Sequence, residues 1–199
     1  HRTSFTQDLA PPSNAVVLFD GTSTDAFKGG TISDEGLLEA GPLLKTTVRD
    51  FRLHLEFRTP YMPYARGQAR GNSGVYIQQR YEVQILDSFG LPGVANECGG
   101  LYKQRRPAVN MCLPPLSWQT YDIEFTMAKF DASRRKSSPA MMTVRHNGVS
   151  IHDKYVLPPV PPGGDESQSK ERQRGAIFLQ DHGNPVRYRN IWVVEREKL

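Results

Sequence analysis

The feature that most limits how this chain can fold is a set of short segments in which apolar and polar residues alternate. Residues 51–58 alternate without a break, with Phe51, Leu53 and Leu55 separated by charged or histidine side chains. A period of two places the apolar side chains on one face of a β-strand and the polar ones on the other. Residues 118–127 repeat the pattern, and no stretch sustains the 3.6-residue apolar period of a helix. The sequence therefore predicts strands.

Turn signals separate these strands at intervals of about ten residues, which is typical of all-β sandwiches and barrels. The Asn147-Gly148 pair is the strongest signal, because this dipeptide favours the tight turn of a hairpin. The 17 glycines and 15 prolines also suit turns and strands better than long helices. We predict an all-β fold, a two-sheet antiparallel β-sandwich in a single domain over residues 15–199, preceded by an N-terminal arm over residues 1–14.

Residues 71–88 read as two short strands joined by a tight connection, and the second strand carries a candidate ligand site. Its alternation directs Val83 and Ile85 to one face and Glu82 and Gln84 to the other. A strand that buries one face and presents an acid and an amide on the other is a plausible floor for a polar ligand.

Composition limits the classes of partner. No run approaches the roughly 18 apolar residues that a membrane-spanning helix needs, so no membrane span is predicted. The net charge is +4, but the basic residues are scattered and no nucleic-acid-binding motif accompanies them. We therefore predict no nucleic-acid partner.

Cys98 and Cys112 are the only cysteines, and they flank a segment rich in glycine, arginine and proline. Closing a loop of this size with a disulfide would stabilise the fold by about 3 kcal/mol. We predict this disulfide, and with it a periplasmic or extracellular location. The alternative is a pair of reduced, buried thiols in a cytosolic protein.

Seven segments in order along the chain resemble the 3-keto-disaccharide hydrolase family, a former domain of unknown function with a concanavalin A-like jelly-roll fold. These segments are LFDGTS at 18–23, DFRLHLEFR at 50–58, NSGVY at 72–76, YEVQILD at 81–87, WQTYD at 118–122, HNGV at 146–149 and LQDHGNPVRYRNI at 179–191. The resemblance implies a sandwich whose concave face binds sugar. It also implies action on glycosides whose C3 hydroxyl a separate oxidoreductase has oxidised to a ketone. Members are often exported and fused to other modules.

The strand that carries Glu82 argues against an ordinary glucanase. Related jelly-roll glucanases place acids at alternate positions of one strand, because retaining hydrolysis needs two carboxylates. Here the comparable positions are Glu82, Gln84 and Leu86, which supply one. A 3-keto sugar needs less: a base removes the acidified C2 proton, a donor stabilises the enolate, and an acid protonates the leaving oxygen at C1.

Candidates exist for each role. Glu82 or His182 could be the base, and Asp181, His182 or Tyr102 could protonate the leaving group. The cations Arg187, Arg189 and Lys103 could stabilise the enolate. We predict Glu82, His182 and Asp181 as catalytic. The substrate-binding residues that we predict are His54, Glu56, Gln84, Lys103, Arg187 and Arg189.

Structural roles are the alternatives for the same residues. Asp181 could simply cap its turn, and Arg187 and Arg189 could form ion pairs with Glu56 or Glu82. No cofactor is required, but a divalent metal is an open possibility. Ca²⁺ would bind carboxylate and backbone oxygens, or His54, Glu56, Glu82 and His182 could meet as a transition-metal site. The competing function is a non-catalytic carbohydrate-binding module with the same fold.

Overall fold

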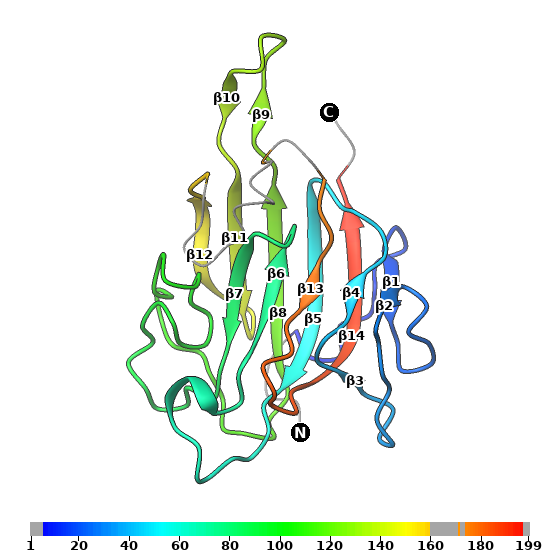
Figure 1. The fold of residues 1–199 in the computed structure, drawn as a ribbon, viewed down its shortest axis with the longest axis vertical. Coiled ribbons are helices and arrows are strands. Elements are labelled where there is room, and N and C mark those ends of the chain that lie inside the picture. The colour runs from blue at the N-terminus through cyan, green and yellow to red at the C-terminus, as the bar shows by residue number, and fades with distance from the viewer. Residues whose placement is uncertain (1–5, 160–170, 172–173, 197–199) are drawn as a thin grey trace.

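The computed structural model describes residues 6–159, 171 and 174–196, which form fourteen β-strands and one short 3₁₀ helix, Gly67–Ala69. Two antiparallel sheets overlap in Figure 1, where β13 crosses in front of β5. This confirms the predicted two-sheet β-sandwich. No helix in the described part of the chain is long and apolar enough to cross a membrane.

The first sheet has seven strands and includes the clearest strand of the sequence. Its order is β1 (Val16–Phe19), β14 (Arg187–Glu195), β5 (Phe51–Arg58), β8 (Gln119–Thr126), β11 (Met141–His146) and β12 (Val149–Val156), with β3 (Leu38–Glu39) also paired to β14. The β11–β12 hairpin turns at Asn147-Gly148, where both residues have positive φ, 51° and 83°. That geometry confirms the hairpin expected from the dipeptide.

The second sheet has five strands and carries the Glu82 strand at its edge. Its order is β2 (Phe27–Lys28), β4 (Leu43–Leu44), β13 (Phe178–Leu179), β6 (Ser73–Ile77) and β7 (Tyr81–Ile85). A separate two-stranded hairpin, β9 (Lys129–Phe130) and β10 (Lys136–Ser138), projects from the sandwich at the top of Figure 1.

The core lies between the two sheets and is built from the apolar half of each alternating strand. Leu53 and Leu55 of β5 have no solvent exposure, and neither do Val83 and Ile85 of β7. Each strand therefore turns its polar residues to the outer face of its own sheet. This arrangement separates polar residues of β5 from those of β7 by the thickness of the sandwich.

Residues 6–9, which belong to the predicted N-terminal arm, lie on the outer face of the seven-stranded sheet. The amide of Asp8 donates to Oε1 of Glu56 at 2.6 Å, and Asn190 Nδ2 donates to the carbonyl of Leu9 at 3.0 Å. Asp8 also accepts from Arg189 Nη2 at 2.8 Å. These contacts attach the segment to β5 and β14 and bury the polar residues beneath it.

The predicted disulfide between Cys98 and Cys112 is absent from the structure, where both are free, buried thiols. Cys98 Sγ lies 3.3 Å from the Tyr121 hydroxyl, and Cys112 Sγ lies 3.5 Å from the Leu86 carbonyl. Hydrogen bonds hold the intervening loop instead: Cys98 N and Asn110 Nδ2 both bind Ser88. Hydrogen bonds rather than a cross-link therefore anchor this loop in the structure.

Candidate functional site

Glu82 lies on the outer face of the five-stranded sheet, as the alternation of β7 predicts. It is paired across the β6–β7 hairpin with Tyr76, whose hydroxyl donates to Glu82 Oε2 at 2.9 Å. Gln78 and Gln79 form the turn with positive φ, 53° and 54°. The hairpin register therefore sets the Tyr76–Glu82 contact, because directly opposed residues of an antiparallel pair share a face.

Gly74 creates the space that the Glu82 carboxylate occupies. An added Cβ on Gly74 would lie 2.4 Å from Glu82 Oε1 and 3.0 Å from its Cγ and Cδ. That separation is well below van der Waals contact, so any side chain at this position would displace the carboxylate. Glu82 therefore lies across the backbone of Gly74, next to the segment that contributes Gln180.

Two glutamines stand on either side of Gly74 and frame the carboxylate. Gln84 is opposite Gly74 on β7, and the amide of Gln180 donates to the Gly74 carbonyl at 2.9 Å. The Gln84 side-chain nitrogen donates to Gln68 Oε1 at 3.0 Å, and that of Gln180 reaches the Tyr76 hydroxyl at 3.5 Å.

The side-chain oxygens of Gln84 and Gln180 are both buried and have no hydrogen-bond partner in the described part of the protein. Buried polar atoms are nearly always paired, so unpaired acceptors need an explanation. Both oxygens flank the Glu82 carboxylate and expose almost no surface, so they mark a polar environment for the carboxylate rather than a ligand contact.

The environment of Glu82 favours proton transfer near neutral pH. Its side chain is 7% exposed, and burial raises the pKa of its carboxyl to about 7, against a smaller lowering by the Tyr76 hydroxyl. No cation within the described residues forms an ion pair with it. Burial and the neighbouring Glu82 raise the pKa of Tyr76, so that phenol stays protonated as a donor.

A segment beside β7 adds Tyr102 and Lys103 to the rim of the site. Leu101 forms a β-bridge with Val83, and the Tyr102 amide donates to the Glu82 carbonyl at 3.0 Å. Lys103 is exposed, and its Nζ lies 5.3 Å from the centre of the Tyr102 ring. Of the three cations predicted to stabilise an enolate, Lys103 is therefore the one beside Glu82.

The other predicted substrate-binding residues lie on the opposite outer face, because they belong to the seven-stranded sheet. His54 and Glu56 of β5 are fully buried there, next to β14 and beneath residues 6–9. Glu56 pairs with Arg189 Nε at 2.9 Å. Arg187, two residues along the same strand, pairs with Glu39 at 2.9 Å. The structure does not bring these four residues together with Glu82.

This separation also removes the transition-metal hypothesis, which required His54 and Glu56 to meet Glu82 and His182. Instead His54 Nδ1 lies 3.1 Å from Asp122 Oδ1. Burial alone would lower the pKa of His54, but Asp122 and Glu56 raise it. Within the described ranges, no group of three or more His, Cys, Asp or Glu residues is arranged to hold a metal ion.

Asp181 and His182 lie in the exposed loop directly after Gln180. Asp181 Oδ1 accepts from the amide of Gly183 at 2.8 Å, which is the turn-capping role weighed for it from the sequence. The structure gives His182 no hydrogen bond or ion pair to any described residue. Both residues border the site through Gln180 without touching Glu82, so their catalytic roles stay predictions.

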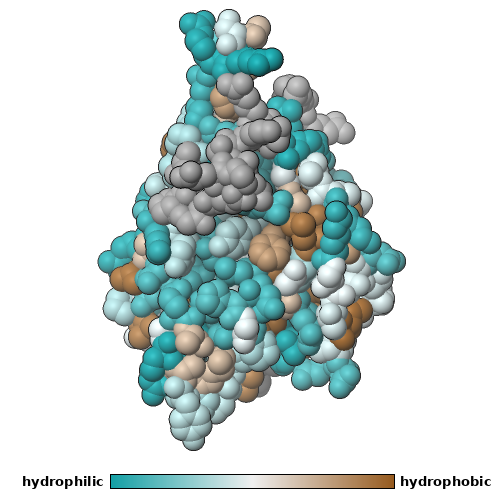
Figure 2. All heavy atoms as spheres, in the orientation of Figure 1, coloured by the Kyte–Doolittle hydropathy of each residue, from teal (hydrophilic) through white to brown (hydrophobic). Residues whose placement is uncertain are grey.

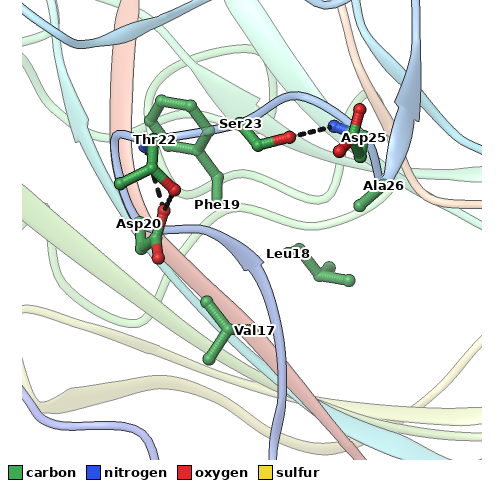
Figure 3. A pocket seen from close by; sticks show the side chains of 8 residues that line it. All are labelled: Val17, Leu18, Phe19, Asp20, Thr22, Ser23, Asp25 and Ala26. Atoms are coloured by element: carbon green, nitrogen blue, oxygen red, sulfur yellow. Dashed lines mark hydrogen bonds between the residues drawn. The ribbon is translucent and has the colours of Figure 1, made fainter.

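A surface cavity of about 280 Å³ lies at the other edge of the sandwich, where the chain passes from β1 to β2 (Figure 3). Asp20 accepts from the amide and hydroxyl of Thr22 at 3.0 and 2.6 Å, and Ser23 accepts from the amide of Asp25 at 3.0 Å. These bonds close the local turn, so its polar groups are already used. The hairpin around Glu82 is the better candidate site.

Sequence reasoning missed Gly74, Tyr76 and Gln180 as members of the site. Tyr76 and Gly74 stand on the neighbouring strand, opposite Glu82 and Gln84, so the signal would have been the hairpin register. Gln180 comes from a segment about a hundred residues away, as its 104-residue separation from Tyr76 shows. No local pattern in the sequence indicates that pairing.

Comparison with known proteins places this geometry in context. The family model of the 3-keto-alpha-glucoside-1,2-lyase-like domain matches residues 14–194, which confirms the resemblance seen in the sequence. A candidate glycosyl hydrolase from Parabacteroides distasonis is 32% identical, with a TM-score of 0.83 over 93% of this chain and 85% of that chain. These matches identify a carbohydrate-active enzyme.

More distant structures share the fold alone. A second candidate glycosyl hydrolase from Parabacteroides distasonis is 19% identical, with a TM-score of 0.63 over 92% of this chain and 99% of that chain. A mutant of the alginate lyase Aly36B, solved with an alginate tetrasaccharide, is 10% identical, with a TM-score of 0.51 over 96% of this chain and all of that chain. A search of curated proteins finds no match.

Proposed function

Because this chain belongs to the 3-keto-alpha-glucoside-1,2-lyase-like domain family, we propose that it cleaves 3-keto-glycosides by removing the proton at C2 and eliminating the substituent at C1. The observation that carries this proposal is the buried Glu82 carboxylate, whose pKa is raised to about 7. A base with a pKa near the working pH combines adequate basicity with a substantial deprotonated fraction.

The hairpin that forms the site presents one carboxylate rather than two. On the face of β7 that carries Glu82 the next residue is Gln84, and the opposing positions on β6 are Tyr76 and Gly74. Ordinary glycoside hydrolysis uses a pair of carboxyl groups about 5–9.5 Å apart. One carboxylate is sufficient when a ketone at C3 has already acidified the C2 proton.

The proposed step balances as a 1,2-elimination. Glu82 takes the proton from C2, and the electrons of that bond form an enolate whose charge lies on the C3 oxygen. The enolate then restores the ketone and forms the C1–C2 double bond as the C1–O bond breaks. The released oxygen takes a proton from Tyr102 at the rim and leaves as an alcohol. Lys103, on the segment beside Glu82, supplies a donor for the enolate oxygen at C3.

A non-catalytic sugar-binding module is the alternative, and the burial of Glu82 argues against it. A carboxylate that serves binding alone is more useful ionised and paired, whereas Glu82 is removed from solvent and, among the residues that the structure describes, its side chain has only a phenol as its partner. Strongly perturbed pKa values in a site are typical of acid–base chemistry.

The test is product release from a 3-keto-glucoside and from the same glucoside unoxidised, with wild type and Glu82→Gln. The amide keeps the shape of the side chain but cannot accept a proton, so activity should fall by about 10²–10⁴-fold. Glu35→Gln, an exposed residue paired with Arg58, is the matched control and should retain full activity. Equal cleavage of both sugars, or an active Glu82→Gln variant, would contradict the proposal.

A further inference from the structure

A row of side chains crosses the five-stranded sheet from Glu82 to the opposite edge. The register pairs Glu82 with Tyr76, Tyr76 with Phe178, Phe178 with Leu43, and Leu43 with Lys28. Directly paired residues point to the same face, so all five stand on the outer face that carries the site. Their neighbours in sequence, such as Leu179 and Leu44, are buried in the core.

We propose that Phe178 and Leu43 form a subsite for the leaving group of the substrate, one that takes a ring with an apolar face. This inference rests on the proposed function and specifies the substrate of that same site. Strands in a sheet lie about 4.8 Å apart, so Phe178 stands about 10 Å and Leu43 about 14 Å from Glu82 along the row. A pyranose ring spans about one such strand spacing, so a second ring beyond the cleaved bond lies over Phe178.

The chemistry of the row changes with distance from Glu82. Phe178 is partly exposed and its ring centre lies 5.9 Å from that of Tyr76, at an angle of 50°. Leu43 beyond it is also partly exposed. Partly exposed apolar surface of this kind suits a ring with a C–H or aromatic face.

Figure 2 views this side of the molecule and shows a mostly hydrophilic surface with a small apolar group near its middle. Apolar residues scattered singly on a protein surface need no special explanation. Here Phe178 and Leu43 occupy adjacent strands and share a row with Glu82. Their continuity with the site is therefore what supports a binding role.

The experiment compares three 3-keto-α-glucosides that differ only in the leaving group: methanol, a second glucose, or 4-nitrophenol. Wild type should prefer the two substrates with a ring, and Phe178→Ala should reduce this preference in kcat/KM about tenfold, as the loss of one apolar contact does. Tyr64→Ala, which removes a 98% exposed aromatic ring from another loop, is the control and should leave the preference unchanged. If Phe178→Ala lowers kcat/KM for the disaccharide alone, the subsite binds sugar. If it lowers kcat/KM for the aryl glucoside alone, the subsite binds an aromatic aglycone.

A binding measurement separates this inference from the proposed function. Calorimetry on Glu82→Gln, with and without Phe178→Ala, reports affinity for the same three compounds without turnover. If wild type does not cleave these compounds, but Phe178→Ala weakens binding of the two ring-bearing compounds about tenfold, the subsite stands and the reaction proposal fails. If Phe178→Ala weakens all three compounds equally, or none, the subsite is refuted whatever the catalytic result.

Discussion

Substitution of Gly74 by alanine tests the site geometry in a way that separates activity from stability. The new Cβ would lie 2.4 Å from Glu82 Oε1, whereas ordinary contacts begin near 3.4 Å. The carboxylate must therefore move by about 1 Å, a misplacement that costs about 10²-fold in rate when the moved group is catalytic.

The expected effect of Gly74→Ala on stability is small. The atom that the new Cβ meets first is the end of a flexible side chain, which can rotate away. Gly74 does not have a positive φ, and glycine within a strand is itself less favourable than alanine by about 0.5–1 kcal/mol. The melting temperature should therefore stay the same or rise while the activity is lost.

The assay is the initial rate on a 3-keto-glucoside together with the thermal unfolding midpoint. Gly36→Ala is the matched control, because Gly36 has φ of 75° and nothing within 4 Å of an added Cβ. That variant should lose about 1 kcal/mol of stability through backbone strain and keep its activity. If Gly74→Ala retains more than half of the wild-type rate while Glu82→Gln is inactive, the placement of the carboxylate over Gly74 is wrong.

Three further predictions concern the titrating groups of the site and the thiols. Tyr76→Phe removes the hydrogen bond that lowers the pKa of Glu82. The rate of wild type should rise with pH around pH 7, and in the variant this rise should move to higher pH. An unchanged pH profile would show that another group titrates. The pKa of Glu82 is about 7 in the folded protein, against an ordinary value of 4.5, so the folded state holds the proton more tightly and ionisation of Glu82 destabilises the fold as pH rises from about 4.5 to 7. In urea titrations, the unfolding free energy of Glu82→Gln should therefore exceed that of wild type by about 3 kcal/mol at pH 8 and by much less at pH 4. Cys98 and Cys112 are free and buried, so a thiol reagent should not modify them in the native protein but should modify both once the protein is unfolded without reductant. If neither reacts after unfolding, the disulfide predicted from the sequence is present.

The local pattern of the chain was sufficient to predict the strands and the orientation of Glu82. The alternation in residues 51–58 and 81–85 marks the strand face that packs in the apolar core, which is a local property, although other segments also bury most of the polar face. The Asn147-Gly148 turn was predictable for the same reason, since the two residues determine the backbone conformation between them. The two-sheet architecture follows from many such strands that each bury one face.

The composition of the site was not predictable, because it depends on which strands share a sheet. The outward alternation of His54 and Glu56 resembles that of Glu82 and Gln84 in every local respect. The structure places β5 in one sheet and β7 in the other, so the two pairs face away from each other. Gln180 joins the site only because β13 pairs with β6, a long-range contact that no local pattern encodes.

The most direct test of the central claim follows the hydrogen at C2 during cleavage of a 3-keto-glucoside in D₂O. Elimination with Glu82 as base predicts that the product, read by NMR or mass spectrometry at early times, has lost the original C2 protium. It holds either no hydrogen at that carbon or deuterium, if water has added back. An enzyme-free control corrects for spontaneous exchange, and Glu82→Gln should abolish both cleavage and C2 hydrogen loss. Product that retains its C2 protium would mean direct displacement at C1 and would contradict the account.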